Sequence, residues 1–424
     1  MNSQTKTARH SRLFIYATLF VFFYTVALSL APAIRVHSTQ IGFEWQFFIP
    51  FLGWFLGAFS LNHAVNRYLP SRDPWIFPSV MLLSGWGLLT VWRLYPSLGQ
   101  RQVIWFLLGC LLFYIGLRRK ELITLLKTYK YIWLVLGLIL IALTIWIGVN
   151  PSGTGPTRWL NAFGLYFQPS EPLKLLILVY LAAFFADQVR PNASLLSTIL
   201  PTLIIIIITG GLLMSQRDLG TAVLFLAFYT LMLSVTTNSR KFLWIIPIII
   251  IIAVVIGYFT IDIVKTRVDI WLNPWLNPSG SSYQIAQAQI AIASGGLFGA
   301  GPGLGSPGIV PVSVSDFIFT AIAEETGLLG TSALLLIYVL IVIRGINIAI
   351  DSKTTFGRYL AFGISMFLAL QSMWIIGANL GIFPLSGVTL PFMSYGGSSL
   401  LTSLIAVLLL LKISSNSSAV ALPD

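Results

Sequence analysis

The sequence predicts an all-α polytopic transmembrane helical bundle of about twelve helices, with large loops on one side of the membrane. Three observations predict this fold class: 57% of the 424 residues are hydrophobic, only 9% are charged, and the mean hydropathy is +0.88. Soluble domains carry about a quarter charged residues. Apolar runs of about 20 residues, the length that crosses a bilayer, recur to the end of the chain.

Each long apolar run predicts one helix, because polar or Gly- and Pro-rich segments separate it from the next run. The first run lacks a small-residue cleavage site and further runs follow it, so we predict a retained span and no signal peptide. In chain order the predicted helices are 13–33, 45–65, 75–94, 102–117, 131–149, 172–189, 195–214, 219–237, 242–262, 316–343, 359–380 and 393–412.

The connecting segments alternate in charge, which predicts the orientation of the chain. One set holds 17 of the 25 basic residues and five acidic residues, so the net charge of +12 falls on this set; the other set is balanced. Cytoplasmic loops carry the excess of Lys and Arg, so both termini are predicted in the cytoplasm, and no nucleic-acid partner is needed to explain the charge. The cytoplasmic set contains Lys6, Arg9, Arg12, Arg67, Arg72, Arg118, Arg119, Lys120, Lys127, Lys130, Arg190, Arg240, Lys241, Arg344, Lys353, Arg358 and Lys412, with Asp73, Glu121, Asp187, Asp351 and Asp424.

The opposite, outer side carries three unusual segments, 150–171, 263–315 and 381–399, which are rich in Gly, Pro and aromatic residues. Irregular backbone near membrane depth must be buried in protein or line a wet cavity. We therefore expect the functional site on the outer side. No metal site is predicted, because the three histidines show no ligand spacing.

Six ionisable residues lie inside the spans or at their outer ends. Left in lipid, each would cost a few kcal/mol, so each should face the interior and find a partner. One interpretation is structural, as helix caps and ion pairs, and it is favoured most for Asp218 as an N-cap. The other is functional, as a carboxylate that acts as general base toward an alcohol. The six are Glu171, Lys174, Asp218, Asp316, Glu324 and Glu325.

Basic residues of the outer segments could hold a phosphate-bearing substrate. The alternative is that their side chains extend to the lipid headgroups. These residues are Arg158, Arg217, Lys265 and Arg267.

Five motifs in the outer segments resemble the SEDS family of RodA/FtsW-type peptidoglycan glycosyltransferases. The resemblance covers about residues 75–412 and implies a ten-helix core that polymerises lipid II into glycan strands on the outer face of the cytoplasmic membrane. The motifs are RWLNAFGLYFQPSEPLK (158–174), QRDLGTA (216–222), YQIAQAQIAIASGGLFGAG (283–301), SDFIFTAIAEETGLLG (315–330) and LPFMSYGGSSL (390–400).

The resemblance implies roles for individual residues. The essential aspartate of the family corresponds to Asp316, which we expect to act as the general base. The substrate and diphosphate site is expected to include Arg158, Trp159, Glu171, Lys174, Arg217, Arg267, Glu324, Glu325, Ser394 and Ser398. We also expect Lys174 to lie near Asp316 and keep its carboxylate ionised.

The sequence departs from the family pattern in three places. Val314 replaces a histidine two residues before the aspartate, and Arg217 replaces a proline. Two extra helices precede the core, so we predict an accessory N-terminal transmembrane hairpin at 1–70, a ten-helix core at 71–415 and a cytoplasmic tail at 416–424.

The predicted function is lipid II polymerisation in the bacterial cytoplasmic membrane, with release of undecaprenyl diphosphate, in cell elongation, shape or division. The resemblance also implies a class B penicillin-binding protein as partner. A divalent cation such as Mg²⁺ could bridge Asp316 and the diphosphate. The alternative function is a lipid II flippase or other lipid transporter, because transporters also contain intramembrane charges. No internal repeat relates the two halves, which favours an enzyme.

Overall fold

A computed structural model describes residues 3–37, 42–151, 153, 156–162, 164–188, 195–237, 239 and 241–418. Three charged residues of the predicted cytoplasmic set, Arg190, Arg240 and Asp424, lie outside this part of the chain.

The described residues form a helical bundle in which twelve long helices occupy the predicted positions, so the predicted all-α fold is confirmed. Among the described residues, ten of them are long and apolar enough to cross a membrane: α1–α4, α6, α8, α9 and α13–α15. Helix α7 is not among the ten, because within its 18 residues it carries Glu171, Lys174 and Asp187. The long helices are α1 (Ser3–Arg35), α2 (Phe48–Tyr68), α3 (Ile76–Leu94), α4 (Pro96–Arg118), α6 (Lys130–Ile147), α7 (Ser170–Asp187), α8 (Leu195–Ser215), α9 (Leu219–Thr236), α10 (Lys241–Thr260), α13 (Ile318–Asp351), α14 (Thr355–Asn379) and α15 (Gly397–Ser418).

Shorter elements lie between the long helices. A two-stranded antiparallel hairpin pairs Leu160 with Phe167 in the first outer segment, where no strand was predicted. The short elements are α5 (Leu122–Thr128), α11 (Asp262–Leu272), α12 (Tyr283–Gly295), β1 (Leu160–Ala162), β2 (Leu165–Phe167) and 3-10 turns at Trp45–Phe47 and Pro307–Ile309.

Several helices begin earlier than the apolar pattern predicted, because polar residues form their first turns. Helix α4 begins at Pro96, whose fixed φ suits the first helical position. At the start of α14 the side chain of Thr354 accepts a hydrogen bond from the Gly357 N–H (3.1 Å), which caps the helix.

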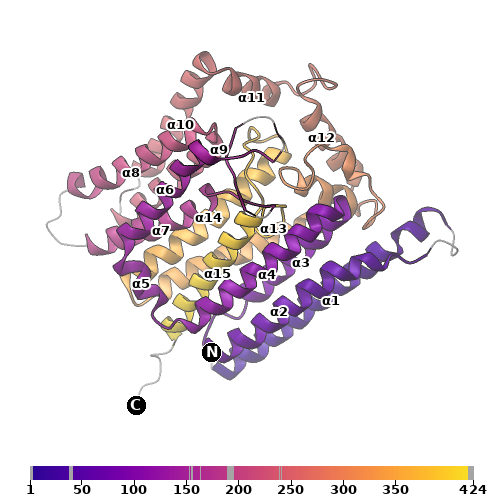
Figure 1. The fold of residues 1–424 in the computed structure, drawn as a ribbon, viewed down its shortest axis with the longest axis horizontal. Coiled ribbons are helices and arrows are strands. Elements are labelled where there is room, and N and C mark those ends of the chain that lie inside the picture. The colour runs from indigo at the N-terminus through magenta and orange to yellow at the C-terminus, as the bar shows by residue number, and fades with distance from the viewer. Residues whose placement is uncertain are drawn as a thin grey trace.

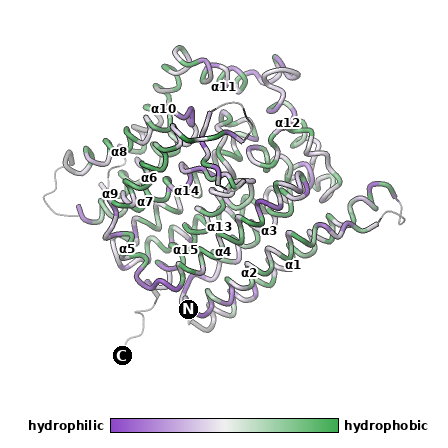
Figure 2. The backbone as a smooth tube through the Cα atoms, in the orientation of Figure 1, coloured by the Kyte–Doolittle hydropathy of each residue, from purple (hydrophilic) through white to green (hydrophobic). Residues whose placement is uncertain are grey.

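The start of α1 and the end of α15 lie at the same end of the bundle, and α11 and α12 lie at the opposite end (Figure 1). Hydrophobic residues line the bodies of the helices, and hydrophilic residues gather at their ends and in the connecting segments (Figure 2). This arrangement is expected of helices that cross a bilayer in alternating directions.

The first two helices pack closely against the rest of the bundle. Trp54 of α2 is fully buried, and its Nε1–H donates to the Met81 carbonyl of α3 (3.0 Å). Gly85 of α3 allows this approach, since a Cβ there would lie 2.7 Å from Val21 and 2.9 Å from Trp54. The hairpin of α1 and α2 is therefore docked on α3 by interlocking side chains.

Helix α13 is interrupted by Gly327, which has φ +64° and ψ −163°. The backbone of residues 296–301 fits into this break: the N–H groups of Ala300 and Gly301 donate to the carbonyls of Glu324 and Glu325 (2.9 Å each). Only glycine accepts this φ without strain. The sequence analysis predicted an uninterrupted helix here, because one glycine does not break the apolar periodicity.

Candidate active site

Asp316 lies in a turn two residues before α13 begins at Ile318, in the segment that connects α12 to α13. Helix α12 lies at the end of the bundle opposite the start of α1 (Figure 1). The sequence analysis placed Asp316 at the first position of α13, and the helix begins two residues later. The Asp316 carbonyl accepts a hydrogen bond from Asn379 Nδ2 at the end of α14 (2.8 Å). Asn379 Oδ1 in turn accepts from the hydroxyl of Thr320 (2.8 Å), so α14 fixes the entry to α13.

Residues 390–395, which precede α15, form hydrogen bonds with the two residues before Asp316. Ser394 Oγ donates to the Ser315 carbonyl (2.6 Å) and accepts from the Leu390 N–H (2.9 Å). The Tyr395 N–H donates to the Val314 carbonyl (2.7 Å). Ser394 was predicted to bind substrate. In the structure its hydroxyl forms hydrogen bonds with backbone groups and holds the residue before Asp316 in place.

The Asp316 side chain is half-buried and lies beside a turn at Gly387. Gly387 has φ +74°, and a Cβ at this position would lie 3.8 Å from Asp316 Oδ2. The segment 381–399 therefore passes directly beside the carboxylate, as its unusual composition suggested.

Burial raises the pKa of the Asp316 carboxyl above its ordinary value. A hydrogen bond from Ser315 and the positive charges of Arg267 and Arg158 oppose this shift, whereas the negative charge of Asp218 adds to it. A raised pKa makes the carboxylate a stronger base than an exposed aspartate. The arginines still favour its ionised form.

Arg267 lies on α11, which is anchored over the site. Four residues further along the same helix face, Trp271 Nε1–H donates to the Gly381 carbonyl (2.9 Å). Burial and the charge of Arg158 lower the pKa of Arg267. Within the described residues its guanidinium donates no hydrogen bond, so its donors remain available for an anion.

Arg158 joins the first outer segment to the connection between α8 and α9. Its Nε–H donates to the Gln216 carbonyl (3.0 Å) and its Nη2–H to the carbonyl of Arg217. Its Nη1 lies 3.8 Å from Asp218 Oδ1. Arg217 is exposed and has φ +58°. The structure thus gives Arg158 backbone partners that the sequence analysis did not predict.

Asp218 begins α9 and accepts a hydrogen bond from the Thr221 N–H (3.3 Å), which confirms the predicted N-cap. It is also buried, and its Oδ2 has no partner among the described residues. Its charge acts on both Asp316 and Arg267. Asp218 therefore belongs to the site, although the sequence analysis left it out; its place inside the QRDLGTA motif was the available signal.

Lys174 does not act on Asp316, so that expectation was wrong. Its Nζ is fully buried and donates to Glu171 Oε1 (2.8 Å) and to Gln371 Oε1 (3.2 Å). The charges around Asp316 are Arg267, Arg158 and Asp218 instead. The Glu171–Lys174 pair neutralises α7 inside the bundle, which matches the structural interpretation of these charges.

Glu324 and Glu325 face the segment before the 3-10 turn at Pro307–Ile309, and not Asp316. Glu324 Oε1 accepts a hydrogen bond from the Ser306 N–H (2.6 Å). Glu325 is buried, and its Oε1 lies 3.5 Å from Arg93 Nη2. These contacts shape this outer segment, and the expected contact of the two carboxylates with substrate stays a prediction.

Two other predicted site residues have structural partners. Ser398 Oγ accepts a hydrogen bond from the Gln168 N–H (2.7 Å), which joins α15 to the first outer segment. Trp159 pairs through its backbone with Val149, which lies two residues after the end of α6.

In the part of the chain that the structure describes, no group of three or more His, Cys, Asp or Glu side chains is placed to hold a metal ion. A divalent cation beside Asp316 would therefore need further oxygen ligands from a bound diphosphate.

Known proteins resemble this chain over most of its length. The peptidoglycan glycosyltransferase RodA of Mycobacterium tuberculosis is 32% identical over 94% of this chain and 90% of its own length. The probable peptidoglycan glycosyltransferase FtsW of Trichlorobacter lovleyi is 34% identical over 74% of this chain and 83% of its own length.

Solved structures share the fold. A chain of a peptidoglycan synthase complex, studied for its coordination of polymerization and crosslinking, matches with a TM-score of 0.70 and 27% identity over 82% of this chain and 99% of that chain. The rod shape determining protein RodA of Thermus thermophilus matches with a TM-score of 0.61 and 25% identity over 82% of this chain and 98% of that chain. A sequence model of the FtsW, RodA and SpoVE cell cycle proteins matches residues 76–419, and the chain belongs to this family.

Proposed function

We propose that this chain is a peptidoglycan glycosyltransferase that polymerises lipid II on the outer face of the bacterial cytoplasmic membrane. The names of its relatives support the activity. The single observation that carries the mechanism is the Asp316 carboxylate, half-buried among the charges of Arg267 and Arg158. A base beside cations is what a glycosyl transfer from a diphosphate requires.

In the proposed reaction, Asp316 accepts the proton from the GlcNAc 4-hydroxyl of an acceptor lipid II. The oxygen then bonds to the anomeric carbon of the lipid-linked donor strand. The bond between that carbon and the diphosphate oxygen breaks, and undecaprenyl diphosphate leaves. The leaving group takes up negative charge, and the guanidinium of Arg267, which donates no hydrogen bond to a described residue, is suited to bind it.

Arg158 and Asp218 have supporting roles in this proposal. Arg158 adds positive charge to the site while its backbone contacts hold the first outer segment against the start of α9. Asp218 offsets part of the positive charge, since its Oδ1 lies 3.8 Å from Arg158 Nη1 and its charge acts on Arg267 and on Asp316. Lys174 is left out of the leaving-group contacts, because it is fully buried and paired with Glu171.

Two further aspects follow from the relatives. One match is a chain of a synthase complex of polymerization and crosslinking, which supports a class B penicillin-binding protein as the partner of this chain. If a divalent cation takes part, Asp316 and the diphosphate oxygens would hold it. Loss of glycan synthesis in EDTA, restored by Mg²⁺, would support such a cation.

The test is a polymerisation assay with purified lipid II, run with and without the co-purified transpeptidase partner. We expect wild-type protein to make glycan chains and Asp316→Asn to lower the rate by about 10²–10⁴-fold, the usual contribution of a general base. Asp262→Asn on α11 is the matched control, because it removes an exposed carboxylate on the same side of the molecule.

The detergent melting temperature of Asp316→Asn should stay near that of wild type. Full activity of this variant would remove Asp316 from the mechanism. Transfer of lipid II across vesicles without any glycan product, with or without the partner, would favour the transporter alternative.

A further inference from the structure

The hairpin formed by α1 and α2 contacts the outer face of the core through the last residue of α1. Arg35 Nη2–H donates to the carbonyls of Gly303 (2.9 Å) and Gly305 (3.0 Å). We call residues 296–306 the glycine loop. The family match begins at residue 76, so this contact joins a segment that precedes the match to a loop inside it.

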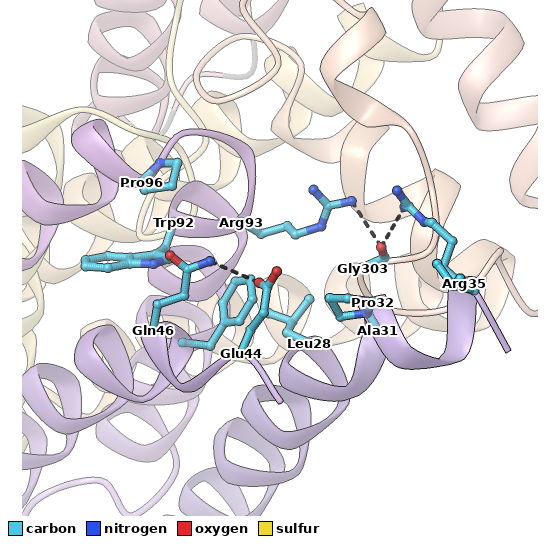
Figure 3. Close-up of a pocket in the computed structure, with 12 residues that line it drawn as sticks. Leu28, Ala31, Pro32, Arg35, Glu44, Gln46, Trp92, Arg93, Pro96 and Gly303 are labelled. Atoms are coloured by element: carbon cyan, nitrogen blue, oxygen red, sulfur yellow. Dashed lines mark hydrogen bonds between the residues drawn. The ribbon is translucent and has the colours of Figure 1, made fainter. Parts of the chain in front are cut away.

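A second arginine donates to the same two carbonyls. Arg93, near the end of α3, donates through Nη2 to Gly303 (3.1 Å) and Gly305 (3.2 Å). Figure 3 shows Arg35 and Arg93 converging on the Gly303 carbonyl from opposite sides. The hairpin and the core thus hold the glycine loop jointly.

Gly303 itself lies against the hairpin. It has φ +78°, and a Cβ at this position would lie 2.6 Å from the Cβ of Ala31 in α1. A side chain would therefore push the loop away from α1. This close approach places the Gly303 carbonyl within reach of both guanidinium groups.

On its hairpin side the glycine loop borders open space. A cavity of about 300 Å³ lies there, lined by Leu28, Arg35, Trp92, Arg93 and Gly303 among others (Figure 3). Side-chain packing does not fill this space, so at Gly303 and Gly305 the loop is held on this side by the arginine hydrogen bonds and by the contact of Gly303 with Ala31.

The glycine loop is in turn tied to α13. The Ser306 N–H donates to Glu324 Oε1 (2.6 Å), and the Gly301 N–H donates to the Glu325 carbonyl (2.9 Å). Residues 307–316 connect the loop directly to Asp316, and α13 begins two residues later. The position of the glycine loop is therefore linked to the position of the Asp316 carboxylate in two ways: through residues 307–316 of the chain, and through the hydrogen bonds between the loop and α13.

We propose that Arg35 is a positioning residue: the N-terminal hairpin fixes the glycine loop through it, and thereby holds Asp316 in the geometry needed for glycosyl transfer. This inference rests on the proposed function. It gives the hairpin a role in the rate of polymerisation beyond that of a membrane anchor. A misplacement of about 1 Å can lower a rate by up to about 10²-fold.

The kinetic test compares three variants in the polymerisation assay. We expect Arg35→Ala to lower kcat several-fold while KM for lipid II changes less than about twofold, because the diphosphate contacts of Arg267 are untouched. Arg35→Lys keeps one donor group and should restore part of the rate. Arg12→Ala removes an exposed charge at the other end of the same helix and should leave kcat unchanged.

The structural test is hydrogen exchange of the peptide that covers the glycine loop. Arg35→Ala should speed exchange at the Gly301 and Ser306 amides relative to wild type and Arg12→Ala, at an unchanged melting temperature. Because both arginines share two acceptors, combining Arg35→Ala with Arg93→Ala should speed exchange by more than the product of the two single effects.

The outcomes separate the two proposals. Wild-type protein that makes no glycan overturns the proposed function, while the exchange data still report whether Arg35 holds the loop. An active wild type whose Arg35→Ala variant keeps both its kcat and its loop protection overturns the role of Arg35. Faster exchange with an unchanged kcat also overturns it, since the loop would then not govern Asp316.

Discussion

Asp316 lies among charges that set how readily its carboxylate accepts a proton. Burial raises its pKa, and the neighbouring arginines lower it. A general base works only when ionised, so the rate should fall as the pH drops through this raised pKa. The acid limb of the pH–rate profile should therefore lie above the ordinary range of an aspartate.

Arg267→Gln tests this charge environment. Arg267 lowers the pKa of Asp316, so removing its charge raises that pKa further and leaves less carboxylate ionised at any pH on the acid limb. We expect the acid limb of kcat/KM to move to higher pH and the plateau to fall by up to about 10²-fold. Asp262→Asn, at an exposed residue of the same helix, is the control. An acid limb that stays in place in Arg267→Gln would contradict the assignment.

The buried pair of Lys174 and Glu171 gives a second prediction at this scale. Lys174→Met leaves Glu171 charged without its partner, which for a buried pair costs about 3–5 kcal/mol of stability. Adding Glu171→Gln removes that charge and should restore most of the melting temperature. We expect the double variant to keep glycan synthesis, measured in the same assay. A stable but inactive double variant would instead assign Lys174 to substrate binding.

Helix α13 depends on the backbone conformation of a single residue, Gly327, which has a positive φ. At Gly327 a Cβ would meet the Leu297 carbonyl oxygen at 2.6 Å, and the positive φ disfavours any other residue. We expect Gly327→Ala to lower stability by more than about 1 kcal/mol and to reduce polymerisation, because the glycine loop can no longer fit into the break.

Gly210 in α8 supplies the control for this prediction. It is helical, and a Cβ there meets no atom within 4 Å. Gly210→Ala should therefore be neutral or stabilise the protein by about 0.5–1 kcal/mol. Melting curves of the two variants in one detergent make the comparison; equal melting temperatures would show that the break in α13 is not required.

For the whole molecule, the charge distribution predicts that the basic connections face the cytoplasm. Cys110, the single native cysteine, is buried and should not react with a membrane-impermeant maleimide. Leu276→Cys, at a side chain that is 82% exposed beyond α11, should label in intact cells. Lys120→Cys should label only after the membrane is permeabilised. The reverse pattern would invert the topology and move Asp316 to the cytoplasmic side.

The sequence by itself predicted the long helices, because the length and composition of an apolar run are local properties of the chain. It also pointed to Asp316 and to the three outer segments, since unusual composition and motifs are visible without coordinates. The N-cap role of Asp218 was predictable for the same reason: a cap involves residues only three positions apart.

Only the tertiary structure decided which side chains meet across helices. Lys174 pairs with Glu171 and Gln371 rather than acting on Asp316, and Glu324 holds the glycine loop. Arg35 reaches a loop 268 residues away. Such contacts depend on the rotation and relative height of packed helices. Many packings satisfy the same apolar pattern, so a linear sequence does not specify these contacts.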